Sequence, residues 1–147
     1  MTLEGTYAPS QQRWVRDQVA EFEASHGARA NTLRDTGAPI VVITSVGAKS
    51  GLLRKNPVMR VERDGTYLAI ASKGGSPDNP EWYHNFLAHP EVELQDGPER
   101  HTYAARLATG DERRRWWQYA VDTWPTYADY EKRTDREIPV FVLERVA

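Results

Sequence analysis

The sequence predicts a mainly β protein with helices (α+β), built as a small antiparallel barrel of six strands. Three observations support this class. From Pro39 onward, apolar residues alternate or run in short β-branched stretches. The pair Asp64 and Gly65 separates two such stretches and is a strong hairpin-turn signal. Most stretches are joined by short connections, as in small barrels, and 147 residues suit a single compact barrel.

The predicted strands follow one another between residues 39 and 146. The first is a run made mostly of β-branched residues, which is typical of a buried strand. In the last, Phe141 and Leu143 are expected on one face, and Val140 and Val142 on the other. The six ranges are Pro39–Val46, Pro57–Arg63, Thr66–Ser72, Glu91–Gln95, His101–Ala108 and Ile138–Val146.

An amphipathic helix is predicted from Gln11 to about Arg29, because Val15, Val19 and Phe22 recur at helical spacing. This apolar stripe could dock on the protein body, on a partner or on a membrane surface. We therefore expect a helical segment over residues 1–30 and a single barrel domain over residues 31–147. Short peripheral helices are expected after an Asn79 cap, after the capping box Thr109–Glu112, and from a second box, Thr126–Asp129.

Composition excludes several function classes. The formal net charge of −2 argues against a general nucleic-acid binder. Residues Met1–Ser10 lack the pattern of a secretory signal, and no apolar run approaches the length of a membrane span. The absence of cysteine excludes thiolate metal sites and disulfides, and it fits a reducing cytoplasm. The four histidines show no convincing metal-ligand spacing, so no metal is expected.

The segment Gly47–Arg60 concentrates positive charge on an otherwise acidic chain. Its glycines, Gly47 and Gly51, can free backbone N–H groups to surround an anion. It is not a P-loop, because that motif requires a glycine directly before its lysine. From charge alone, a solvated basic turn is the favoured interpretation. The cations of this segment are Lys49, Arg54, Lys55 and Arg60.

A second segment, Ala71–Ser76, again combines a lysine, Lys73, with glycines and hydroxyls at a strand end. The hairpin at residues 64–65 is expected to bring both basic loops to one barrel mouth, which would suit an acidic cofactor. Trp124, Tyr127 and Tyr130 could cover a planar substrate by stacking. Because no nucleophile or acid–base constellation stands out, the chemistry is expected to come from a cofactor.

Several ordered motifs between residues 31 and 146 resemble one known family, the deazaflavin-dependent nitroreductases of actinobacteria. The segments that carry the resemblance are Gly47–Gly51, Arg54–Glu62, Ala71–Gly75, Pro80–Asn85, Val92–Gly97 and Thr134–Leu143.

That resemblance implies a split β-barrel like that of FMN-binding proteins. It also implies coenzyme F-420, an 8-hydroxy-5-deazaflavin with a phosphate and an oligoglutamate tail. The reduced ring would pass a hydride to a quinone, a nitroaromatic or an unsaturated lactone. The implied substrate-binding residues are Met59, Ser72, Trp124, Tyr127 and Tyr130. The implied cofactor-binding residues are Ala48, Lys49, Ser50, Arg54, Lys55, Asn56, Pro57, Val58, Met59, Ile70, Ala71, Ser72, Lys73, Trp82 and Asn85.

Two positions depart from the resembled family. Relatives active on nitroimidazoles tend to carry tyrosine where this chain has Met59 and Trp124, so nitroimidazole reduction is not expected to follow from the resemblance. An FMN-binding oxidoreductase of the same barrel class and a non-catalytic deazaflavin carrier remain the alternative functions. The resemblance also leaves open a homodimer and a peripheral membrane contact through the N-terminal helix.

Overall fold

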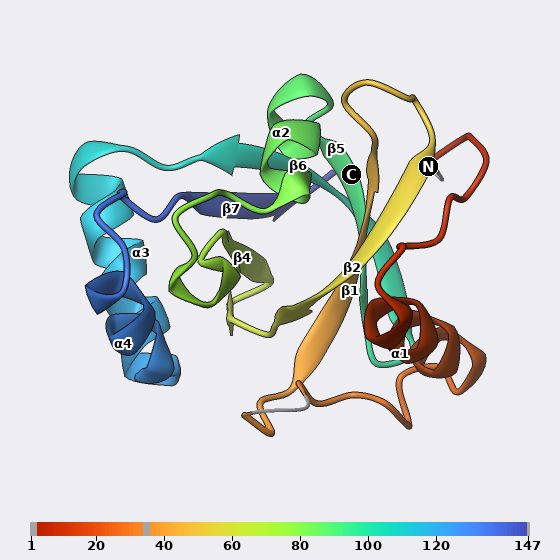
Figure 1. The fold of residues 1–147 in the computed structure, drawn as a ribbon, viewed down its shortest axis with the longest axis horizontal. Coiled ribbons are helices and arrows are strands. Elements are labelled where there is room, and N and C mark those ends of the chain that lie inside the picture. Colours follow the sequence, from red (N-terminus) through yellow and green to blue (C-terminus); the bar gives the residue numbers. More distant parts are fainter. Residues whose placement is uncertain (1–2, 34–35, 147) are drawn as a thin grey trace.

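The computed structural model describes residues 3–33 and 36–146; residues 1–2, 34–35 and 147 of the predicted domains lie outside it. Its centre is a single sheet of seven antiparallel strands with the order β2-β1-β5-β6-β7-β4-β3, surrounded by helices (Figure 1). The strands are β1 (Ile40–Val46), β2 (Leu53–Met59), β3 (Glu62–Arg63), β4 (Thr66–Ile70), β5 (Glu91–Asp96), β6 (Glu99–Leu107) and β7 (Val140–Arg145). The helices are α1 (Arg13–Ala24), α2 (Glu81–Ala88), α3 (Gly110–Thr123) and α4 (Thr126–Lys132), with a 3-10 turn, η1 (Lys73–Gly75).

The predicted count of six strands is wrong by one, because the expected strand Pro57–Arg63 is really two. β2 begins earlier, at Leu53, and pairs with β1 along its whole length, from Val46 opposite Leu53 to Ile40 opposite Met59. Pairing with β1 ends at Arg60, whose N–H still donates to the carbonyl of Pro39 (2.8 Å). The chain then turns to form β3 against β4. The first half of β2 was not predicted because its residues are mostly polar. It is an edge strand, and an edge strand need not bury most of its side chains.

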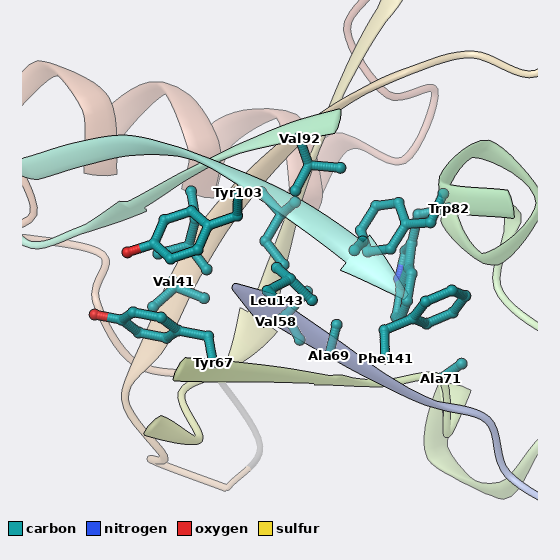
Figure 2. Close-up of a cluster of buried hydrophobic side chains, with 14 residues drawn as sticks. Val41, Val58, Tyr67, Ala69, Ala71, Trp82, Val92, Tyr103, Phe141 and Leu143 are labelled. Carbon is teal, nitrogen blue, oxygen red and sulfur yellow. The ribbon is translucent and has the colours of Figure 1, made fainter. Parts of the chain in front are cut away.

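The sheet curls so that β2, at one edge, comes into contact with β4 near the other edge. The concave face holds a closely packed apolar core, to which Figure 2 shows side chains contributed from both edges. The hydroxyls of Tyr67 and Tyr103 lie at one end of this core, and Trp82 and Phe141 at the other. As predicted, Phe141 and Leu143 face this core, whereas Val140 and Val142 of β7 face the other side of the sheet, where they are buried in a second core.

Two further cores form on the convex face. Against β1, the stripe of Val15, Val19 and Phe22 packs onto Ile40 and Val42, so the structure docks this stripe on the protein body. On the far side of the molecule, α3 and α4 cover β4 and β7 (Figure 1). No helix within residues 3–33 and 36–146 is long and apolar enough to cross a membrane.

The helices occur where the sequence predicts them, but the predicted caps are not formed. The expected helix of residues 11–29 ends at Ala24, with Gly27 following in a left-handed conformation. Pro80, rather than Asn79, is the residue that precedes α2, and the Asn79 side chain accepts a hydrogen bond from Arg136 instead. Thr109 makes no side-chain cap at α3, and Thr126, the first residue of the second predicted box, is itself the first residue of α4 and follows Pro125. At Asn79 a tertiary partner has taken up the polar side chain.

Candidate cofactor-binding site

An open cavity of about 1300 Å³ runs along β2 and the end of β4, where the two edges of the curled sheet approach each other. Its volume exceeds the range of about 300–1,000 Å³ common for small-molecule pockets, so it has room for an extended ligand. Its walls come from the N-terminal segment, both basic loops, α2 and α4. The lining residues are Ser10, Gln11, Gln12, Trp14, Val15, Leu33, Gly47, Ala48, Lys49, Ser50, Arg54, Asn56, Pro57, Val58, Met59, Ile70, Ser72, Lys73, Gly74, Pro80, Glu81, Trp82, His84, Asn85, Tyr127 and Tyr130.

The first basic loop is the tight turn between β1 and β2. Gly47 donates its N–H to the carbonyl of Leu52 (2.8 Å), and Gly51 donates back to Gly47 (3.0 Å). Gly51 has a φ of +72°, which favours glycine. The turn is also tied to α2, because the Ala48 N–H donates to Oδ1 of Asn85 over 2.9 Å. The loop is therefore closed mainly by its own backbone.

The four cations of Gly47–Arg60 do not share one role. Lys55 forms an ion pair with Glu23 of α1 and does not line the cavity. Arg60 donates through Nε to Oδ2 of Asp96 (2.8 Å), an interaction that raises its pKa although burial opposes this. Lys49 and Arg54 line the cavity and form no ion pair with any residue that the structure describes. These two charges are available to an anionic ligand.

The second basic loop is the η1 turn after β4. Its three residues all have positive φ angles, +46° at Lys73, +63° at Gly74 and +83° at Gly75. The Gly75 N–H donates to Ser72, but the N–H groups of Lys73 and Gly74 donate to no residue within the described ranges. Both of these residues line the cavity. Successive N–H groups in this conformation make an anion-binding concavity.

Arg136, which precedes β7, holds this second loop from behind. Arg136 lies within the motif Thr134–Leu143, and because over 60 residues separate it from the turn, no local sequence pattern predicts its role here. Burial lowers its pKa and the nearby Asp78 raises it, but an arginine remains charged. Its donors reach the carbonyls of Ala71 (3.0 Å), Ser72 (2.8 Å) and Ser76 (3.0 Å), and Oδ1 of Asn79 (2.8 Å).

The edge of β2 presents backbone groups to the cavity. Leu53 exchanges two hydrogen bonds with the N-terminal segment, at Thr6 and Ala8 (2.9 Å each). Because backbone direction alternates along a strand, the odd-numbered residues after Leu53 turn their N–H and C=O groups toward this same edge. Pro57 has no N–H, and it lies at a position whose N–H would point to the free edge, where no neighbouring strand needs a donor. The N–H of Met59 and the C=O of Pro57 are therefore directed toward the open side.

The aromatic wall differs in part from the predicted one. Tyr127 and Tyr130 of α4 line the cavity, with ring centroids 6.2 Å apart. Burial raises the pKa of Tyr127, so its phenol stays neutral. Trp124 does not line the cavity; its indole N–H donates to the carbonyl of Arg60 (3.0 Å). Trp14 of α1 also lines the cavity, a placement that the sequence pattern gave no means to predict.

The chain matches the model of the family described as F420H2-dependent quinone reductase over residues 14–145. It belongs to this family. An F420H2-dependent quinone reductase of Mycobacterium tuberculosis is 36% identical over 110 residues, which cover 73% of this chain and 74% of the relative. A solved F420-H2 dependent reductase is 50% identical and aligns with a TM-score of 0.68, covering 72% of this chain and 94% of that one.

Two further solved structures bear on the fold of this family member. One, described as a domain-swapped dimer, is 43% identical, has a TM-score of 0.71, and covers 92% of this chain and 100% of its own. A pyridoxamine 5'-phosphate oxidase-like protein from Listeria innocua is only 13% identical, with a TM-score of 0.51 and coverage of 74% and 84%. It shows the shared barrel fold alone, in agreement with the predicted split barrel.

The cavity brings together most of the residues expected at the quinone reductase site. Every expected cofactor-binding residue lines it except Lys55, which pairs with α1, and Ala71, whose backbone groups bond to Arg136 and Pro139. Of the expected substrate-binding residues, only Trp124 lies outside the lining. No group of three or more His, Asp or Glu residues in the described part of the chain could hold a metal ion.

Proposed function

We propose that this chain is an F-420-dependent oxidoreductase that transfers a hydride from the reduced deazaflavin to a planar acceptor, with a quinone as the favoured class. One observation carries the proposal. In a member of this family, a single large cavity gathers Lys49, Arg54 and Lys73, none of them in an ion pair with a described residue. Charges left unpaired at a cavity wall suit a polyanionic ligand.

The residues present fit coenzyme F-420. Lys49 and Arg54 would hold the oligoglutamate tail, since arginine binds carboxylates with two parallel donors. Lys73 and the free N–H groups of the second loop would hold the phosphate. The open edge of β2 offers alternating N–H and C=O groups to the ring. The ring would also meet Ala48, Ser50, Asn56, Pro57, Val58, Met59, Ile70, Ser72, Trp82 and Asn85. When bound, the reduced cofactor supplies the hydride.

The acceptor would occupy the side of the cavity bounded by α4 and α1. Tyr130 supplies flat aromatic surface with a polar tip, the buried Tyr127 packs against it, and Met59 and Ser72 border the same space. Trp14 would close this wall from α1 and help to exclude water from the reacting atoms. Because the wall is aromatic and only sparsely polar, it suits quinones, nitroaromatics or unsaturated lactones more than charged acceptors.

The setting that we propose is a cytoplasmic homodimer. The related domain-swapped dimer supports association of two chains, and the lack of cysteine fits a reducing compartment. We do not propose membrane contact through the apolar stripe of α1, because Val15, Val19 and Phe22 are buried against β1.

The direct test follows the oxidation of reduced F-420 by purified protein against a panel of quinones, nitroaromatics and unsaturated lactones. We expect turnover that depends on the protein and is fastest with a quinone. Tight F-420 binding without turnover of any acceptor would instead support a deazaflavin carrier. Purification of a yellow, FMN-loaded protein that ignores F-420 would support the FMN-dependent alternative. Either result would contradict the proposal.

A further inference from the structure

The η1 turn depends on support from outside its own sequence. Left-handed conformations are unfavourable for an L-residue such as Lys73, and three consecutive positive φ angles form no regular helix. Within the loop, the short backbone bonds are those from Gly75 to Ser72 (2.9 Å) and from Ser76 to Lys73 (3.1 Å). A strained conformation persists only when the surrounding structure enforces it.

Arg136 provides that enforcement through a single planar guanidinium. The three carbonyls that it binds belong to residues 71, 72 and 76, which flank the turn on both sides. Arg136 itself does not line the cavity. These oxygens are thus bonded to a group outside the cavity, while Lys73 and Gly74, whose N–H groups donate to no described residue, line it. An anion site needs this separation, because carbonyl oxygens repel the ligand that the N–H groups attract.

The turn is also in tight contact with α4. A Cβ added to Gly75 would lie 2.8 Å from the carbonyl oxygen of Tyr130 and 2.7 Å from Cβ of Arg133. Arg136 therefore connects the turn to a chain segment that is already packed against it. It fixes both the backbone direction and the distance from α4.

We propose that Arg136 is a positioning residue that presents the Lys73–Gly74 N–H groups to the anionic part of the cofactor. The proposal rests on the proposed function, since it assumes that F-420 is the ligand. Arg136 acts through the turn and contacts neither cofactor nor acceptor. A lysine cannot replace it, because one ammonium group cannot reach four acceptors in the fixed fork of a guanidinium.

The test compares Arg136→Lys with Arg113→Lys. Arg113 is a matched control, because its guanidinium donates to the carbonyl of Ile138 (2.6 Å) in the same connecting segment without touching the turn. Binding of two oxidised probes would be measured by fluorescence titration. One is complete F-420, and the other is 8-hydroxy-5-deazariboflavin, which lacks the phosphate and the tail.

We expect Arg136→Lys to weaken F-420 binding about tenfold while the affinity for the truncated probe stays within about twofold. Arg113→Lys should leave the ratio of the two affinities unchanged. Partial unfolding lowers both affinities equally, so the ratio reports positioning and not stability. An equal loss for both probes, or no loss for either, overturns the role of Arg136. Failure of the wild-type protein to bind F-420 contradicts the proposed function instead.

A double-mutant cycle with Lys73→Ala gives a second measurement that does not depend on one variant. If Arg136 acts through the turn, the two substitutions together should weaken F-420 binding by less than the product of their separate effects. Independent, multiplicative effects would overturn the proposal.

Discussion

The two basic loops of the cavity are built by opposite means. The Gly47–Leu52 turn closes on itself through backbone hydrogen bonds, needs one left-handed glycine, and adds a single side-chain tether at Asn85. The η1 turn has three residues with positive φ angles and is held by Arg136, over 60 residues away in sequence. The first loop and the adjoining start of β2 supply side-chain charge, from Lys49 and Arg54, and the second loop supplies one lysine with free backbone N–H groups.

The difference shows that one anion site can combine a loop whose shape depends mainly on its own residues with a loop whose shape depends on distant ones. A turn closed locally keeps its shape when distant residues change, whereas a strained turn transmits such changes directly. We therefore expect substitutions in the first loop to act on ligand charge, and substitutions around the second to act on geometry and stability.

The largest effect is expected from removal of the two cavity charges that lie close together in sequence, Lys49 in the first loop and Arg54 near the start of β2. The double variant Lys49→Ala with Arg54→Ala should weaken F-420 binding about 100-fold, since each charge-assisted contact contributes about 1.5 kcal/mol or more. Fluorescence titration measures this loss, and it should shrink at high salt. Lys132→Ala, an exposed cation of α4, is the control. Unchanged affinity for F-420 in the double variant would refute the role of the Lys49 and Arg54 charges in binding the ligand.

Two glycines of the second loop allow the stability cost of a steric clash to be distinguished from the cost of a left-handed backbone conformation. Gly75→Ala should lower the free energy of unfolding by about 3 kcal/mol, because it adds a clash with α4 to an unfavourable φ. Gly74→Ala should cost only about 1 kcal/mol, since nothing lies within 4 Å of its added Cβ. Urea denaturation measures both. Equal losses of unfolding free energy in the two variants would show that contact with α4 does not constrain the turn.

The single tether of the first loop is tested at Asn85. Asn85→Ala removes the acceptor of the Ala48 N–H and should destabilise the protein by about 1 kcal/mol. Asn85→Asp keeps an acceptor at this position but adds a negative charge beside the cavity. It should retain most of the stability and still weaken F-420 binding. If Asn85→Asp bound F-420 normally, the anionic part of the ligand could not lie near this turn.

The smallest effect concerns alkaline pH and α4. Burial raises the pKa of Tyr127 above its usual value, so the folded state holds the phenol proton more tightly than the unfolded state. This contribution to stability is complete below about pH 10 and is lost as the pH rises through and above that value. Tyr127→Phe should reduce the alkaline loss of unfolding free energy by less than about 1 kcal/mol near pH 10.5. An identical pH profile in wild type and variant would contradict this.

The sequence alone supported the α+β class, the helices and most strands, because their signals are local. A run of β-branched residues predicted β1, and alternating side chains predicted the two faces of β7. Apolar residues at helical spacing predicted α1. It missed the first half of β2, whose polar residues satisfy no burial pattern, and it assigned Lys55 to the ligand although Glu23 pairs with it. It also predicted a helix cap at Asn79, whose side chain instead accepts a hydrogen bond from the distant Arg136.

For the site, sequence by itself determined which chemistry is available: two glycine-bearing basic loops and a set of aromatic residues, each encoded within a few consecutive positions. Only the tertiary structure decided which of these groups share a cavity. Trp14 lines the cavity and Trp124 does not. Lys55 and Arg60 form ion pairs with other parts of the protein. Arg136 forms hydrogen bonds with the second loop. Such pairings depend on how the curled sheet brings its edges together, and no local pattern records the distance between residues far apart in the chain.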